Sequence, residues 1–130
     1  MVAALYEAHY GSLTRIAALL VSDGPAAEEI VQDAFVSVYH AWRHLRNGER
    51  ALEYLRRTVV RRARAEAAGR PGPPGVLLPA TLRGLPVRQR EALILKYYAD
   101  WPDRQIAAAM GISGRALYAH IRRGLSSLEA

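Results

Sequence analysis

The most informative part of the sequence is DRQIAAAMGISGRALYAHIRRGL, residues 103–125. Its apolar residues recur at helical spacing on both sides of a Gly-Ile-Ser break, which predicts two helices, over 103–110 and 113–128. Gly111 suits the left-handed backbone that a tight turn needs, and Ser113 is placed to cap the second helix. The pattern predicts a helix-turn-helix; the alternative is a plain antiparallel helix pair with a glycine turn.

The second of these helices has an apolar face and a cationic face. The residues that we expect to be buried are Leu117, Ile121, Leu125 and Leu128. A DNA-recognition helix needs this division, because one face must be held rigidly while the other offers donors to phosphates and base edges. The candidate residues for binding duplex DNA are Ser113, Arg115, Tyr118, Ala119, Arg122 and Arg123.

Three further helices are predicted at the start of the chain. The stretch SDGP, residues 22–25, ends the first helix, and its proline suits the first turn of the second. The stretch RNGE, residues 46–49, separates the second helix from a third, which runs from 50 to about 68.

The stretch GRPGPPG, residues 69–75, marks a linker, because proline and glycine at this density cannot continue a helix. A helix follows from Pro86, and its expected apolar face consists of Leu93, Ile94, Tyr97 and Tyr98. No β alternation stands out, so we predict an all-α fold. Its expected parts are a helix bundle over 1–68, a short Pro/Gly linker over 69–81 and a helix-turn-helix domain over 82–130.

The third helix is strongly basic. Arg57, Arg61 and Arg64 are spaced i, i+4 and i+7, so they share one stripe that could follow a phosphate backbone. Tyr54 at the edge of the stripe, with Trp42 upstream, could stack on unpaired bases. The alternative is a solvated basic face with both aromatic residues in the core, and we favour the core for Trp42.

The second helix is acidic instead. Glu28, Glu29 and Asp33 are expected near its start, where the helix dipole favours anions, and they could also dock a protein. His40 and His44 have the i, i+4 spacing of metal ligands, but no third ligand is obvious, so we expect exposed histidines, no metal and no cofactor. No nucleophile–base pair or phosphate loop is recognisable, which argues against an enzyme.

Composition supports an anionic partner. Lys and Arg number 18 against 12 Asp and Glu, which gives a net charge of +6 and suits nucleic acid. The sequence contains no cysteine, which excludes disulfides and thiolate chemistry and fits the cytoplasm. Its N-terminus does not read as a signal peptide, and its apolar runs are too short for membrane insertion.

Three blocks in this order resemble an extracytoplasmic-function sigma factor of bacterial RNA polymerase, of the actinobacterial type. They are the stretch from Leu5 to Trp42, which contains AAEEIVQDAFVSVY (26–39), then RALEYLRRTVVRRARAE (50–66), and the stretch from Leu85 to Leu128 that contains the helix-turn-helix. The resemblance implies a sigma region-2-like bundle and a region-4-like helix-turn-helix, with RNA polymerase core and promoter DNA as partners. It also implies a possible anti-sigma factor.

The resemblance implies a role for each block. The 26–39 block would dock on the clamp helices of the largest polymerase subunit, through Glu28, Glu29, Gln32, Asp33 and Phe35. The segment 44–64 would melt and hold the −10 element, with the loop 45–49 taking a flipped base. The residues implied there are Asn47, Tyr54, Arg56, Arg57, Arg61 and Arg64. The C-terminal motif would read the −35 element, and the first helices of its domain would grip the polymerase flap.

The sequence departs from the family pattern at several positions. Arg61 stands where the family often has Asn, and Tyr118 and His120 replace a Lys and an Arg of the recognition helix. The connection from Gly69 to Arg83 reaches at most about 50 Å, at about 3.3 Å per residue, so it threads less deeply into polymerase than the longer family connectors or leaves the modules packed together. Two alternatives stay open: a helix-turn-helix regulator that never enters polymerase, and a sigma-like adaptor without initiation activity.

Overall fold

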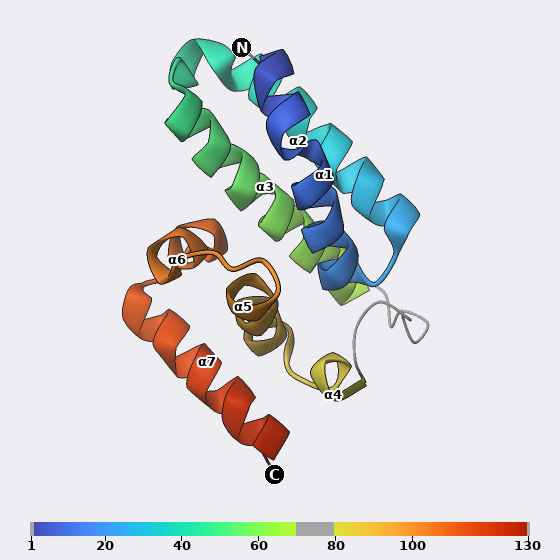
Figure 1. Cartoon of the computed structure of the whole chain (residues 1–130), viewed down its shortest axis with the longest axis vertical. Coiled ribbons are helices and arrows are strands. Elements are labelled where there is room, and N and C mark those ends of the chain that lie inside the picture. Colours follow the sequence, from blue (N-terminus) through green and yellow to red (C-terminus); the bar gives the residue numbers. More distant parts are fainter. Residues whose placement is uncertain (1, 70–79, 130) are drawn as a thin grey trace.

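The computed structural model describes residues 2–69 and 80–129, and within them it is entirely helical. The helices are α1 (Val2–Val21), α2 (Gly24–Leu45), α3 (Gly48–Gly69), α4 (Ala80–Arg83), α5 (Val87–Tyr97), α6 (Asp103–Met110) and α7 (Gly114–Glu129). Figure 1 shows α1, α2 and α3 side by side as one bundle, with α5 and α6 between α3 and α7. The predicted all-α class is confirmed. We call α1–α3 the N-terminal module and α4–α7 the C-terminal module.

The N-terminal module is delimited by local signals that the sequence carries. Asp23 caps α2, because its Oδ1 accepts from the backbone N–H of Ala26 at 3.2 Å, and Pro25 lies in the first turn. The helix ends at Arg46, whose backbone is left-handed at φ 45°. The core between the three helices consists of Leu13, Ile16, Ala17, Leu20, Ala27, Ile30, Val31, Ala34, Phe35, Val38, Ala51, Leu55, Val59, Val60 and Ala63.

The C-terminal module contains the predicted helix-turn-helix. Helix α6 spans the predicted 103–110, and it ends at Gly111, which has φ 69° as its turn requires. The Oγ of Ser113 accepts from the backbone N–H of Ala116 at 3.1 Å and so caps α7, as predicted. Leu117 and Ile121 are buried and hold α7 against the rest of the module.

Two predictions about buried faces in this module are wrong. Tyr97 and Tyr98 are exposed, because the consecutive residues 91–95 of α5 are buried instead and the helix ends at Tyr97. Leu125 and Leu128 are 37% and 38% exposed, since the last turns of α7 extend past the helices that cover its start.

The two modules pack directly on each other. Helix α3 lies against α6 and α5, and α1 touches α5, so the buried side chains form one cluster across both modules. The predicted linker over 69–81 falls mostly on residues 70–79, outside the described part of the chain, and α4 begins at Ala80. This packing determines which of the candidate binding faces are covered.

Candidate nucleic-acid interface

The basic face of α3 is partly covered by the C-terminal module. Arg64 donates two hydrogen bonds to the carboxylate of Glu91 on α5, from Nε at 3.0 Å and from Nη2 at 2.6 Å. Glu91 is 3% exposed and also lies 3.8 Å from the Nη1 of Arg88. A bidentate pair of this kind is a strong charge-assisted contact, so one candidate DNA ligand is already occupied by the protein's own carboxylate.

The next arginines along α3 also contact the C-terminal module. Arg57 donates from Nε to the backbone carbonyl of Ala108 at 3.4 Å, although most of its side chain stays exposed. The guanidinium carbon of Arg56 lies 5.6 Å from the ring centroid of Trp101, within the range of a cation–π contact. Burial lowers the pKa of Arg56, and the nearby Glu53 opposes this effect.

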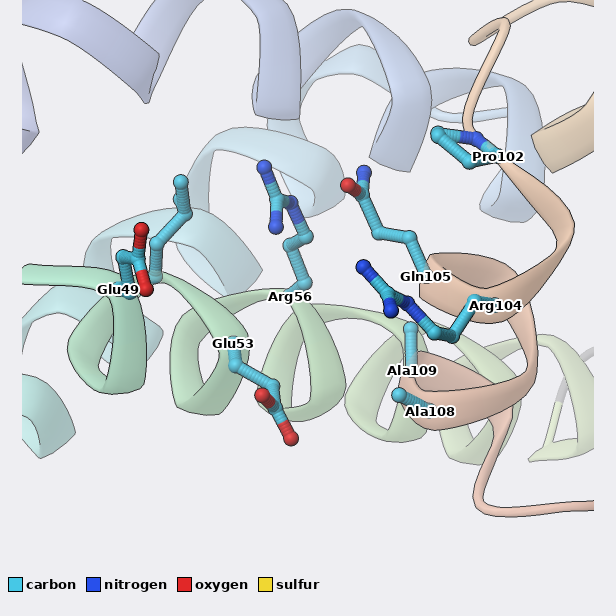
Figure 2. Close-up of a pocket in the computed structure, with 9 residues that line it drawn as sticks. Glu49, Glu53, Arg56, Pro102, Arg104, Gln105, Ala108 and Ala109 are labelled. Carbon is cyan, nitrogen blue, oxygen red and sulfur yellow. The ribbon is translucent and has the colours of Figure 1, made fainter.

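A cavity of about 650 Å³ separates part of α3 from α6. Figure 2 shows Arg56 from α3 and Arg104 and Gln105 from α6 along this hollow, with Glu49 and Glu53 also on α3. Although the buried apolar side chains of the two modules form one cluster, this edge of their contact is partly open and is lined by both polar and apolar side chains. Such a surface can be separated at a lower free-energy cost than a dry core.

The remaining candidates for the −10 element lie in different surroundings. Arg61 is exposed, and Tyr54 is half-buried against the core. Asn47 accepts through Oδ1 from the backbone N–H groups of Glu49 at 2.8 Å and Arg50 at 3.4 Å, which caps α3. This capping explains Asn47 without DNA. We call the arginines of α3 at positions 56, 57, 61 and 64 the cationic track, and its exposed part is centred on Arg57 and Arg61.

The candidate duplex-binding face of α7 is open. Arg115, Tyr118, Arg122 and Arg123 are all exposed, while Ala119 is half-buried. The Nη1 of Arg122 donates to the hydroxyl of Tyr118 at 3.3 Å, one helical turn away. Figure 1 shows α7 on the side of the molecule away from α3, so packing between the modules leaves this face accessible.

His120 does not supply the positive charge of the arginine that the family resemblance places at its position. Its Nδ1 is buried and has no hydrogen-bond partner in the structure. Burial is the main cause that lowers its pKa, and Arg88 and Arg123 act in the same direction. A neutral imidazole at neutral pH follows, so His120 adds no positive charge to α7 there.

The acidic residues of α2 are exposed, but they do not lie in its first turn. The helix starts at Gly24, so the expectation that the helix dipole accounts for Glu28, Glu29 and Asp33 is wrong. Asp33 lies 3.6 Å from Arg62 of α3, and both line a groove of about 700 Å³ that also contains Glu29. The helix dipole therefore does not account for the presence of these exposed carboxylates on α2.

Gln32 and Phe35 differ from the other docking candidates. Gln32 is exposed and donates to the hydroxyl of Tyr10 at 3.4 Å. Phe35 is 5% exposed, and its ring packs against Tyr6 and Tyr10 with centroids 5.0 and 6.4 Å away. Phe35 thus supports the docking helix from the core and is not part of its surface.

Two features of the C-terminal module were missed by sequence reasoning. The first is Glu91, a carboxylate inside the run REALILK, where its position among buried apolar residues was the available signal. The second is an apolar groove of about 260 Å³. It is lined by Thr81, Leu82, Leu93, Tyr97, Tyr98, Leu125 and Leu128.

The described ranges 2–69 and 80–129 show neither a cluster of metal ligands nor a membrane-spanning helix. No group of three or more potential ligands is found there, and His40 and His44 are both exposed. No helix in these ranges combines the length and the apolar character needed to cross a membrane.

The fold and these surfaces define an all-helical protein of two modules, one with a basic helix and one with a helix-turn-helix. Residues 5–69 match the family model of Sigma-70 region 2, and residues 76–128 match that of Sigma-70, region 4. The chain belongs to the sigma-70 family and is a sigma factor, a non-enzymatic initiation protein. Its two regions imply RNA polymerase core and promoter DNA as partners.

A solved structure supports the same architecture. The chain is similar to a chain in the "Structure of CnrH in complex with the cytosolic domain of CnrY", with a TM-score of 0.80 and 24% identity over 98% of this chain and 84% of that chain. At this identity the likeness shows the fold. A comparison with curated proteins finds no significant match.

Proposed function

We propose that this sigma factor belongs to the extracytoplasmic-function group, of the actinobacterial type, and works in the cytoplasm. The N-terminal module docks on polymerase through α2 and holds the opened −10 element along α3, while α7 reads the −35 element. The observation that carries this proposal is the placement of three separate surfaces on one chain: exposed carboxylates on α2, a cationic track on α3 and an open cationic face on α7. A simple repressor needs only the last of them.

The docking surface of α2 is formed by Glu28, Glu29, Gln32 and Asp33. Their exposure in the second and third turns supports this role, because the helix dipole does not explain carboxylates beyond the first turn. The core position of Phe35 limits it to supporting the helix. Charge complementarity at such a site raises the association rate with a basic partner more than it raises affinity.

In this proposal the whole of the cationic track on α3 becomes available only when the modules separate. In the packed form Arg64 is paired with Glu91, and Arg56 and Arg57 contact the C-terminal module. Binding of opened DNA by these arginines therefore competes with the contact between the modules. Polymerase favours the separated form if its own sites for the two modules are far apart, because both cannot then be filled by the packed chain.

The apolar groove of the C-terminal module is the second contact with polymerase in this proposal. It would take the flap, in keeping with the role that the family resemblance gives to the first helices of region 4. The exposed Tyr97, Tyr98, Leu125 and Leu128 support this assignment, since a folded domain rarely keeps so many large apolar side chains together at its surface. An anti-sigma factor remains a proposed partner.

Abortive transcription on a promoter library with purified polymerase core tests the proposal. The protein should give promoter-dependent product, and Arg57→Ala should reduce opening of the −10 region while Arg15→Ala, an exposed arginine on α1, should not. Duplex binding without core binding would instead indicate a stand-alone regulator, and core binding without product would indicate an adaptor. Either result would contradict the proposed function.

A further inference from the structure

We propose that Tyr118 and Arg122 read DNA as one unit, in which the tyrosine ring packs on a thymine methyl group and its hydroxyl holds the guanidinium for a nearby guanine. The inference rests on the proposed function, because it takes α7 to lie in the major groove of duplex DNA. It goes further by naming the base chemistry that these two side chains recognise. Tyr118 stands where the family resemblance leads us to expect a lysine.

The placement of the two residues supports joint reading. Leu117, Ile121 and Gly124 are the buried residues of α7, whereas Tyr118 and Arg122 lie beside this buried stripe and are exposed. The guanidinium of Arg122 lies over the ring of Tyr118. Tyr118 is 58% exposed. The ring is therefore available to a ligand.

The contact between the two side chains positions the guanidinium. The Nη1 of Arg122 donates to the Tyr118 hydroxyl at 3.3 Å, and the guanidinium carbon lies 5.8 Å from the ring centroid. A guanidinium has five N–H donors in a fixed fork, so the remaining donors can still form a bidentate contact. Holding the side chain in advance reduces the conformational freedom that is lost on binding.

The chemistry of the pair selects particular base edges. The O6 and N7 atoms of guanine accept a bidentate arginine in the major groove, and the thymine methyl group offers an apolar contact there. Residues four apart are separated by about 6 Å along a helix, at about 1.5 Å per residue. Bases rise by about 3.4 Å, so the two contacts fall within about two base pairs of each other. Ala119, between them, leaves room for close approach.

The alternative explanation is that Tyr118 and Arg122 form an exposed i, i+4 pair that only stabilises the helix. The two explanations differ in a measurable way. A pair that serves the helix alone predicts no dependence of DNA binding on a thymine methyl group or on guanine N7. A reading unit predicts both dependences, and it assigns each of them to a different part of the tyrosine.

The test starts with the full chain and a randomised 14-base-pair duplex library, from which bound sequences are selected. We expect the selected sites to contain a thymine and a guanine within two base pairs. Affinity for the selected duplex is then measured by fluorescence anisotropy, with deoxyuridine in place of the thymine or 7-deazaguanine in place of the guanine. Loss of the methyl group should weaken binding about three- to fourfold. Loss of N7 should weaken it about fivefold or more.

Two variants separate the ring from the hydroxyl. Tyr118→Phe should keep the preference for thymine over deoxyuridine and lose most of the preference for guanine over 7-deazaguanine. Tyr118→Ala should lose both preferences. Tyr39→Ala, which removes an equally exposed tyrosine from α2, should lose neither. Because both positions are exposed, unchanged thermal unfolding of the three variants would confirm that they are folded.

The possible failures are distinguishable. If the wild type selects a defined site but Tyr118→Phe and Tyr118→Ala keep both base preferences, the reading unit is refuted while the proposed function stands. A selected site that lacks the thymine–guanine combination refutes the inference in the same way. If the wild type selects no sequence from the duplex library and gives no promoter-dependent product with polymerase core, the proposed function itself fails.

Discussion

Replacing Glu91 by Gln should release the two modules from each other. The substitution keeps the size of the side chain but removes the charge that Arg64 contacts at 2.6 and 3.0 Å. Breaking a buried ion pair costs about 3–5 kcal/mol, and the 27% exposure of Arg64 places the expected cost lower, at about 2–3 kcal/mol. The equilibrium between packed and separated modules should then shift by about 30- to 150-fold.

Energy transfer between two dyes measures this shift. The chain contains no cysteine, so cysteines introduced as Tyr39→Cys and Ser127→Cys give one labelling site on each module. Transfer efficiency should fall in Glu91→Gln, and the affinity for a single-stranded −10 oligonucleotide should rise. Glu7→Gln, which removes an exposed carboxylate from α1, is the charge-matched control.

A partner variant keeps the result interpretable. Arg64→Gln should separate the modules as well, because it breaks the ion pair with Glu91. It should not raise single-strand affinity, because it also removes one of the proposed DNA ligands. The double variant should open little more than either single variant, as expected for two residues of one contact. Unchanged transfer efficiency in a folded Glu91→Gln protein would refute the idea that this pair holds the modules together.

Four further outcomes are expected. Gly124→Ala should lower the free energy of unfolding by about 1–3 kcal/mol, since its new Cβ would lie 2.9 Å from Leu93 Cδ1, and thermal melts would measure this. Stability should decrease as pH falls below about 6.5, because the lowered pKa of His120 means that the unfolded chain binds its proton more readily; melts of His120→Gln should show a smaller decrease. Glu29→Arg should weaken binding to polymerase core in a pull-down, and wild-type affinity would count against the docking role. Arg123→Ala should weaken duplex binding and flatten its salt dependence, whereas an unchanged salt slope would exclude a phosphate contact.

The helices could be predicted because their ends are encoded locally. Pro25 and Gly111 determine the backbone of one or two residues, and capping by Asp23 and Ser113 needs only neighbours three residues away. The predicted span 103–110 therefore matches α6. Signals of this kind act within a single turn, so a sequence without its tertiary context already contains them.

The buried faces were less predictable because they depend on what covers each helix. The run at residues 91–95 is buried on all sides, since α5 touches α1, α3, α6 and α7, and this left Tyr97 and Tyr98 outside. The pairing of Arg64 with Glu91 joins residues 27 positions apart on different modules. Helical spacing placed Arg64 on the cationic stripe but could not reveal that the chain's own carboxylate occupies it.

The outward position of α7 has a consequence for how a molecule finds its target before it meets polymerase. In the proposed function α3 holds the opened strand and α7 reads the groove. Within the described residues the packed form partly covers α3 but leaves the cationic side of α7 open, so this proposal makes α7 available to duplex DNA before polymerase is met. With a net charge of +6, such a molecule can slide along intact double helix and sample sequences without unwinding any of them. Scanning and unwinding thereby become successive events, separated by the encounter with the enzyme.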